Sequence, residues 1–151
     1  MSSLLDTNVL LRVVHKNDPL HQVSLAAIRT LRTSREPLYY TPQILAEFWN
    51  VCTRPASARG GFGLSPGETE RRAKIIEHYL DLLPDSLTTY LEWRRLIVAH
   101  TISGVAVHDA RIVASMKVYN VRQLVTFNVD DFRRYRGLSV LTPQALSSLA
   151  P

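Results

Sequence analysis

Short apolar runs alternate along this chain with longer stretches in which apolar residues recur at helical spacing. The two patterns differ because side chains repeat every two residues in a strand and every 3.6 residues in a helix. Their alternation predicts an α/β protein with a parallel sheet and right-handed crossovers. About five strands are expected, at residues 4–5, 38–41, 80–83, 122–127 and 138–141.

Polar capping residues precede most of the predicted helices. Asp18, Thr41 and Ser65 are each followed by proline, which is favoured at the first helical position. Ser86 caps a further helix, whose inner face is predicted to carry Leu87, Tyr90, Trp93, Leu96 and Ile97. The helices are predicted at residues 9–14, from 19 onward, 42–54, 66–79, after 86 and 108–119, with a terminal helix or tail after residue 141.

Residues 54–64 (RPASARGGFGL) are the one stretch rich in both glycine and proline. This composition is typical of a loop, and a mobile loop near a binding site is the interpretation that we favour. The segment is too short to separate two domains. The chain is therefore expected to form a single domain over residues 1–151.

The composition is that of a basic protein without disulfides. Eighteen basic and thirteen acidic residues give a net charge of +5, and the isoelectric point is about 9.7. A polyanionic partner explains this charge, and so does solubility alone. The single cysteine, Cys52, fits a reducing compartment, so a cytoplasmic location is expected. No apolar run is long enough for a signal peptide or a membrane span, so no membrane association is expected.

Three carboxylates stand where apolar residues are expected. Asp6 follows the first predicted strand, at the edge of the sheet where ligands bind in open α/β folds. Glu47 lies three residues after Ile44 and four before Val51, on the apolar face of its helix. Asp109 lies at the start of the predicted helix 108–119, on the same face as its apolar residues. Taken singly, such residues are explained by a helix cap or by an ion pair with an arginine.

Taken together with the polar group at residues 128–131, the three carboxylates predict a divalent metal site. Like charges brought into one crevice repel one another unless a cation neutralises them. Carboxylate oxygens select Mg²⁺ or Mn²⁺ over zinc. Such a site polarises a phosphoryl group and activates water for in-line attack, as metals do in nucleases.

Other catalytic signatures have less support. No glycine-rich fingerprint follows the first strand, which disfavours dinucleotide binding and a P-loop. No Cys/His metal set and no nucleophile-elbow serine is present. The Asp6-Thr7-Asn8 sequence suggests an aspartyl-phosphate phosphatase, but the second acid of that motif is replaced by Asn8. His108 adjoins Asp109 and could act as a base, although a helix-cap or surface role is the commoner one.

Four segments together resemble the PIN domain, and most closely the VapC-type toxins of toxin–antitoxin pairs. They are residues 4–10 (LLDTNVL), Glu47, residues 108–114 (HDARIVA) and residues 124–132 (LVTFNVDDF). The resemblance implies a three-layer α/β/α sandwich and a Mg²⁺- or Mn²⁺-dependent endoribonuclease. It also implies a homodimer that is inhibited by a small antitoxin protein.

The resemblance further implies roles for individual residues. Asp6, Glu47 and Asp109 match the three acids of the family, so Asp6 and Asp109 would bind the metal, and Glu47 would bind it or orient the attacking water. Thr7, Thr126 and Asn128 would support these carboxylates. Many members carry a fourth acid where this chain has Asn128, and Asp131 or Asp130 could replace it through a water. The predicted RNA-binding residues are Arg54, Arg59, Arg71, Arg72, Arg133, Arg134 and Arg136.

Two other functions and one docking surface complete the sequence-based hypotheses. The chain could be a PIN-fold RNA-binding or regulatory protein that does not cleave RNA, or a metal-dependent phosphatase of small molecules. As for the antitoxin, an acidic crevice bordered by apolar helices should accept an amphipathic helix carrying a lysine or arginine. Val14, Phe48 and Tyr79 are the predicted exposed apolar positions of that groove.

Overall fold

The computed structural model describes residues 1–148 of the chain. No helix within these residues is both long and apolar enough to cross a membrane. In chain order the elements are β1 (Ser3–Leu5), α1 (Thr7–Val14), α2 (His21–Thr33), β2 (Leu38–Tyr40), α3 (Pro42–Thr53), α4 (Pro66–Tyr79), β3 (Asp81–Leu82), α5 (Leu87–Ala99), α6 (Ala106–Val118), β4 (Gln123–Val125), the 3-10 helix η1 (Val129–Phe132), β5 (Ser139–Leu141) and α7 (Pro143–Ser147).

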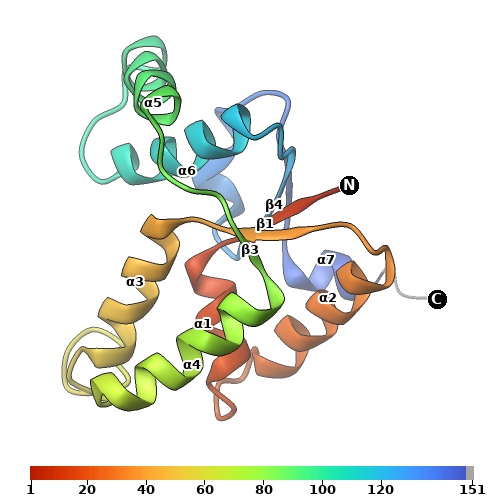
Figure 1. Ribbon diagram of the computed structural model, residues 1–151, viewed down its shortest axis with the longest axis vertical. Coiled ribbons are helices and arrows are strands. Elements are labelled where there is room, and N and C mark those ends of the chain that lie inside the picture. The colour runs from red at the N-terminus through yellow and green to blue at the C-terminus, as the bar shows by residue number, and fades with distance from the viewer. Residues whose placement is uncertain (149–151) are drawn as a thin grey trace.

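The first strand lies at the centre of a five-stranded parallel sheet with the order β3-β2-β1-β4-β5. Leu4 of β1 is opposite Tyr39 of β2 on one side and Leu124 of β4 on the other. Figure 1 shows α5 and α6 on one face of the sheet and α1, α2, α3, α4 and α7 on the other face. The predicted three-layer architecture with a central parallel sheet is therefore confirmed.

The sheet has one position at which the direction of winding changes. The chain passes from β1 to β2 on one side, and β4 later pairs with β1 on the opposite side. In open α/β sheets the crevice at such a switch point, beyond the carboxyl ends of the strands, is where ligands bind. Asp6 and Thr126 directly follow these two central strands, so the topology places both at this crevice.

Side-chain caps explain where several helices begin. Thr41 Oγ1 accepts a hydrogen bond from the N–H of Ile44, and Ser65 Oγ accepts one from the N–H of Glu68. Asp18 was predicted to cap a helix that begins at residue 19, but its carboxylate accepts a hydrogen bond from the N–H of Leu20 within a turn. Helix α2 therefore begins only at His21. Helix α6 begins at Ala106, two residues before the predicted start.

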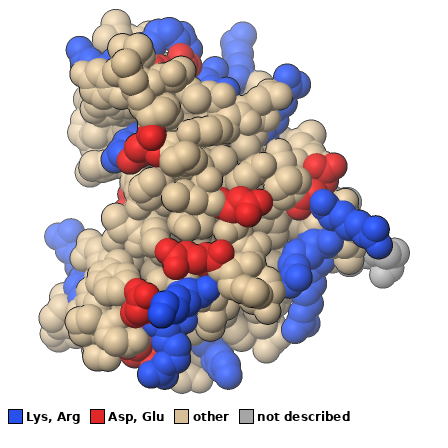
Figure 2. All heavy atoms as spheres, viewed as in Figure 1, with Lys and Arg blue, Asp and Glu red and all other residues tan. Residues whose placement is uncertain are grey.

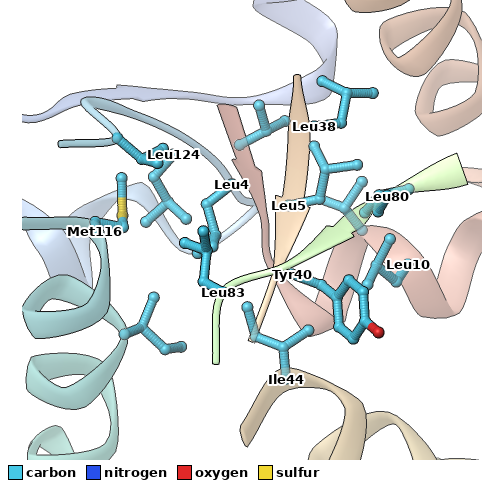
Figure 3. Close-up of a cluster of buried hydrophobic side chains, with 14 of the residues drawn as sticks. Leu4, Leu5, Leu10, Leu38, Tyr40, Ile44, Leu80, Leu83, Met116 and Leu124 are labelled. Carbon is cyan, nitrogen blue, oxygen red and sulfur yellow. The ribbon is translucent and has the colours of Figure 1, made fainter. Parts of the chain in front are cut away.

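The apolar side chains of β1 divide between two cores, one on each face of the sheet. In Figure 3, Leu4 lies on the side that faces Met116 of α6, and Leu5 lies on the other side, near Leu10 and Leu80. This division follows from the alternation of side chains along a strand. Burial on both faces explains why β1 reads as a continuous apolar run, and why the carboxylate that ends it stands out in the sequence.

Two predictions about exposure are wrong. Of the predicted inner face of α5 only Leu96 is buried, whereas Leu87 and Tyr90 are exposed. The reason is that α5 packs chiefly against α6 and no further layer covers it. Phe48 was predicted to be exposed beside a groove but is fully buried, because it shares the inner face of α3 with Ile44.

The glycine-rich segment 54–64 is held against neighbouring helices by its own hydrogen bonds. The N–H groups of Phe62 and Leu64 donate to the carbonyl oxygens of Val51 and Cys52, at the end of α3. The Phe62 ring also stacks on His15, with 4.2 Å between the ring centroids. Figure 1 places this segment at the end of α3 that lies away from the sheet. The predicted loop exists, but it is anchored and it lies away from the carboxyl edge of the strands.

Gly61→Ala is expected to destabilise the fold by about 1–3 kcal/mol. A Cβ atom at Gly61 would collide with the backbone carbonyl oxygens of Arg54 and Pro55, which cannot rotate aside as a side chain could. The midpoint of urea unfolding measures the change. Gly67→Ala is the matched control, because its nearest neighbour would be Ser65 Oγ at 4.0 Å. Equal midpoints for the two variants would contradict the expectation.

Candidate active site

Asp6 joins the end of β1 to the start of α1. Its Oδ1 atom accepts a hydrogen bond of 2.7 Å from the N–H of Thr7. Its Oδ2 atom accepts bonds from Thr126 Oγ1 at 2.6 Å and Asn8 Nδ2 at 3.1 Å. Burial raises the pKa of Asp6, and the hydrogen bonds from Thr126 and Thr7 oppose this rise. Asp6 is thus a helix cap, and it is also a carboxylate held rigidly at the edge of the sheet.

Thr126 and Asn8 connect this carboxylate to the end of β4. Thr126 is fully buried, and its Oγ1 atom accepts bonds of 3.0 Å from Asn8 Nδ2 and from the N–H of Asn128. Asn8 Oδ1 accepts a bond from the N–H of Phe127. Among the predicted supporting residues, Thr126 therefore contacts a carboxylate directly, whereas Asn128 contributes through its backbone. Sequence reasoning did not assign Asn8 to the site, although its position two residues after Asp6 was an available signal.

Glu47 projects from α3 and is held by two donors. Its Oε2 atom accepts a bond of 3.1 Å from Thr7 Oγ1, and its Oε1 atom accepts one of 2.9 Å from Gln43 Nε2. Gln43 Nε2 also donates to the carbonyl oxygen of His108 at 3.0 Å, so it ties α3 to the start of α6. Gln43 was not predicted to belong to the site. Its spacing of one helical turn from Glu47 is the signal that could have found it.

Asp109 lies half-buried in the first turn of α6. Within residues 1–148 its carboxylate accepts no hydrogen bond. Its pKa is raised to about 6, first by burial and then by repulsion from Asp131, Asp6 and Glu47, while His108 opposes the rise. A carboxyl group that three others perturb lies near all of them. The structure therefore brings the three predicted acids and Asp131 into one electrostatic cluster.

The structure distinguishes the three candidates for the fourth acidic position. Asp130 is exposed and forms an ion pair of 2.7 Å with Arg133 on the same short helix. Asn128 is exposed at the start of that helix. Asp131 instead raises the pKa values of both Asp6 and Asp109, so it is the acid of η1 that faces the cluster.

Asp131→Asn is accordingly expected to weaken divalent metal binding, whereas Asp130→Asn should leave it near the parent value. Removing a residue that supports a metal ligand typically costs roughly 10–100-fold in affinity. Isothermal titration with Mn²⁺ measures both variants against the parent. The assignment of Asp131 fails if Asp130→Asn shows the larger loss.

The donor chemistry of the cluster fits Mg²⁺ or Mn²⁺, but the side chains are not closed around a common point. Within the described part of the chain, no three Asp, Glu, His or Cys side chains are gathered closely enough to hold an ion as they stand. Asp6 and Glu47 are fixed by hydrogen bonds, as described above. Asp109 lacks such bonds and Asp131 is exposed, so both can rotate. Four hard-oxygen carboxylates that repel one another are the donor set that these cations prefer.

Several of the predicted RNA-binding arginines are engaged in local contacts of their own. Arg71 and Arg72 form ion pairs with Glu68 on α4, and Arg133 pairs with Asp130. Arg54 donates to the carbonyl oxygen of Arg59 within the segment 54–64. Figure 2 shows basic side chains over the lower half of the molecule, where α4 and α2 lie in Figure 1, and also over the upper half, where α5 and α6 lie. None of the seven arginines in the prediction forms an ion pair with Asp6, Glu47 or Asp109 in residues 1–148.

A five-stranded parallel sheet with acidic residues near its switch point defines an α/β protein with a candidate site at the carboxyl edge of its strands. The sequence model of the PIN domain matches residues 3–138. The chain therefore belongs to the PIN domain family, and the predicted resemblance is confirmed. None of the curated proteins compared with the chain matches it significantly in sequence.

Solved structures with the same fold include toxin–antitoxin proteins. VapBC2 from Rickettsia felis, solved with a promoter DNA fragment, is 18% identical with a TM-score of 0.65, covering 94% of this chain and 98% of that one. VapBC-1 from nontypeable Haemophilus influenzae is 20% identical with a TM-score of 0.65, covering 95% and 98%. VapC20 from Mycobacterium tuberculosis, a toxin that cleaves the sarcin-ricin loop, is 17% identical with a TM-score of 0.61, covering 85% and 92%.

Proposed function

We propose that this protein is a Mg²⁺- or Mn²⁺-dependent endoribonuclease and the toxin component of a toxin–antitoxin pair. The observation that carries the proposal is the cluster of Asp6, Glu47, Asp109 and Asp131 at the switch point of the sheet. Burial, and after it repulsion from Asp131, Asp6 and Glu47, raises the pKa of Asp109 to about 6, and a bound cation would relieve this repulsion. The similarity to VapC20, a toxin that cleaves RNA, supports the choice of substrate.

In the proposed mechanism Asp6 and Asp109 hold the metal ion, and Glu47 holds it or orients the attacking water. At such a site the ion supplies Lewis acidity toward the phosphoryl oxygen and a lowered pKa for bound water. Thr126 and Asn8 keep the Asp6 carboxylate in one orientation, because both donate to its Oδ2 atom. Gln43 and Thr7 fix Glu47 in the same way. The chain's own contribution is thus preorganised oxygen ligands.

The basic surface would bind the phosphate backbone of the RNA. Arg54, Arg59, Arg71, Arg72 and Arg133 remain the proposed contacts, and the net charge of +5 favours a polyanion. Cleavage of a mixed RNA pool, with Mg²⁺ and then with chelator, tests the proposal. Binding without cleavage would favour the alternative of a regulatory RNA-binding protein, which draws support from the open spacing of the acids. Hydrolysis of small phosphate esters alone would favour a phosphatase.

The proposed antitoxin site is a groove between α1, α2 and α4. It has a volume of about 730 Å³, and its walls include Val14, Ile28, Ile75 and Tyr79. Of the predicted groove positions, Val14 and Tyr79 line this groove, whereas the buried Phe48 is replaced by the exposed Ile75. The apolar side chains of this groove can accept the apolar face of an amphipathic helix. The charged lining of the groove is mainly basic, unlike the acidic crevice that was predicted, and Arg71 and Arg72 are shared with the proposed RNA contacts. The similarity to a structure described as a toxin–antitoxin complex, from Klebsiella pneumoniae, supports an antitoxin as the partner.

Ile75→Asp is expected to disrupt the complex with the small protein encoded beside this gene, while RNA cleavage is retained. A charge placed among the apolar side chains of the groove would be desolvated on binding. Co-purification after joint expression measures the complex. Leu87→Asp is the matched control, since Leu87 is exposed on α5, on the opposite face of the sheet. A complex that survives Ile75→Asp would exclude this groove.

We further propose that the protein is a homodimer. The edge strand β3 offers unpaired backbone groups, and a pocket beside it is lined by Leu45, Trp49 and the exposed Leu82. Uncovered sheet edges with apolar neighbours are templates for pairing with another chain. Light scattering coupled to size-exclusion chromatography measures the mass directly, and a monomer at micromolar concentration would reject the proposal.

A further inference from the structure

A pocket between α5 and the start of α6 includes His108, the residue before Asp109, and shares no lining residue with the antitoxin groove. It has a volume of about 410 Å³, and its walls include Tyr90, Trp93, His108 and Arg111. His108 directly precedes Asp109, and its carbonyl oxygen accepts a bond from Gln43, which also holds Glu47. In Figure 1, α5 lies above α6, on the face of the sheet opposite α4. The pocket therefore adjoins the first turn of α6, the helix that carries Asp109.

Aromatic side chains give this pocket its character. The indole of Trp93 is fixed, because its Nε1 atom donates to the carbonyl oxygen of Val107 at 2.9 Å. The Tyr90 ring lies 6.1 Å from the Trp93 ring, is tilted by 51°, and is 52% exposed. Tyr90, beside a fixed tryptophan, therefore presents aromatic surface to solvent. Fixed rings are favourable binding surfaces because little conformational entropy is lost when they are covered.

Charge at the rim of the pocket complements a nucleotide. Arg111 pairs with Asp85 at 2.8 Å, and both side chains are about half exposed. The Arg111 guanidinium can contact a phosphate. The Asp85 carboxylate can accept a hydrogen bond from the edge of a base, and a ring nitrogen of His108 can accept or donate one. The pocket is smaller than the antitoxin groove and has the size of a site for one small planar group.

We infer that this pocket holds a single unstacked base of the RNA substrate, next to the phosphodiester bond that is cut. The inference rests on the proposed ribonuclease function and adds to it a site for substrate recognition. Proteins that recognise single-stranded RNA splay bases out of the stack and place them on aromatic side chains. Tyr90 and Trp93 supply that surface. The fixed position of the pocket beside Asp109 would set which bond of the RNA reaches the carboxylates.

The test measures RNA binding instead of cleavage. All proteins carry Asp109→Asn so that the probe stays intact, and the probe is a short fluorescein-labelled single-stranded RNA of randomised sequence, followed by fluorescence anisotropy. Tyr90→Ala is expected to weaken binding about fivefold or more, because stacking of one base is worth about 1–3 kcal/mol and 1.4 kcal/mol is a factor of ten. Tyr90→Phe keeps the ring and should bind like the parent. Circular dichroism melting confirms that each variant is folded.

Two controls separate base stacking from other effects. Leu91→Ala changes a neighbouring residue of α5 that is 56% exposed and lies outside the pocket, so its RNA affinity should equal that of the parent. An abasic ribose-phosphate strand of the same length should bind the parent and Tyr90→Ala equally, because it carries the charge without the bases. An equal loss of affinity for the abasic strand would overturn the inference.

The remaining outcomes distinguish this inference from the function on which it rests. If the parent binds the RNA and Tyr90→Ala binds it equally well, the base pocket is rejected while the ribonuclease proposal stands. If the parent binds no RNA, both are rejected. Unchanged RNA affinity together with loss of the antitoxin complex would assign the pocket to a protein side chain, which also overturns the inference.

Discussion

Asp109→Asn is expected to abolish RNA cleavage while leaving the protein folded. The amide keeps the shape of the carboxylate but cannot supply its charge to a divalent cation. Loss of a supporting residue costs roughly 10–100-fold in metal sites, and loss of a direct ligand should cost more. Within residues 1–148 the Asp109 carboxylate accepts no hydrogen bond, so the substitution breaks no structural contact. Gel analysis of RNA cleaved in Mg²⁺ measures the effect.

Asp6→Asn should also abolish cleavage, but its interpretation is less direct. The Asp6 carboxylate accepts bonds from Thr7, Asn8 and Thr126, and an amide NH₂ would face these donors. Glu70→Gln is the control for both variants, because Glu70 is exposed on α4 and pairs only with Lys74. Cleavage by Asp109→Asn within a few-fold of the parent would reject the active site.

The second large effect is expected in thermal stability. In chelator, Asp109→Asn should melt at or above the temperature of the parent, because Asp109 is repelled by Asp131, Asp6 and Glu47 and gains no hydrogen bond in return. Saturating Mg²⁺ should reverse this order. A ligand at 100 times its dissociation constant adds about 2.7 kcal/mol to the stability of the state that binds it. For a chain of this length each kcal/mol raises the Tm by roughly 2–4 °C.

The parent should therefore gain several degrees from Mg²⁺, and Asp109→Asn should gain little. Differential scanning fluorimetry across Mg²⁺ and Mn²⁺ titrations measures both curves. Asp6→Asn is unsuitable for this experiment because Asp6 also caps α1. Melting temperatures that do not respond to either cation would reject a metal site at this cluster.

The fold was predictable from the sequence because burial leaves a simple pattern. A strand buried on both faces, such as β1 with Leu4 and Leu5, reads as an apolar run, and capping residues such as Thr41 and Ser65 mark helix starts. The exposure of a side chain was less predictable where it depends on which other elements pack over its helix. The apolar spacing on α5 is helical, yet Leu87 and Tyr90 are exposed because α5 packs chiefly on α6. Spacing alone cannot reveal how many layers surround a helix.

The acidic residues of the candidate site could be picked out from the sequence. The uncharged polar residues that contact them were harder to identify. Asp6, Glu47 and Asp109 stood out because a carboxylate interrupts an apolar pattern. Asn8 and Gln43 interrupt nothing, since polar residues are ordinary on the exposed side of a helix. Their contacts to Thr126 and to the carbonyl oxygen of His108 span 118 and 65 residues, and such pairings depend on the completed sheet.

The place of β1 at the centre of the sheet has a consequence for protein synthesis. Its neighbour β4 is made more than 100 residues later, and Thr126, which holds the Asp6 carboxylate, follows β4 directly. Because a chain leaves the ribosome with its N-terminus first, the cluster cannot assemble until translation has nearly ended. A growing chain therefore carries Asp6 without Thr126, and carries Asp6 and Glu47 without the acids of α6 and η1. Any message broken before the codon for Thr126 would encode a polypeptide without this site.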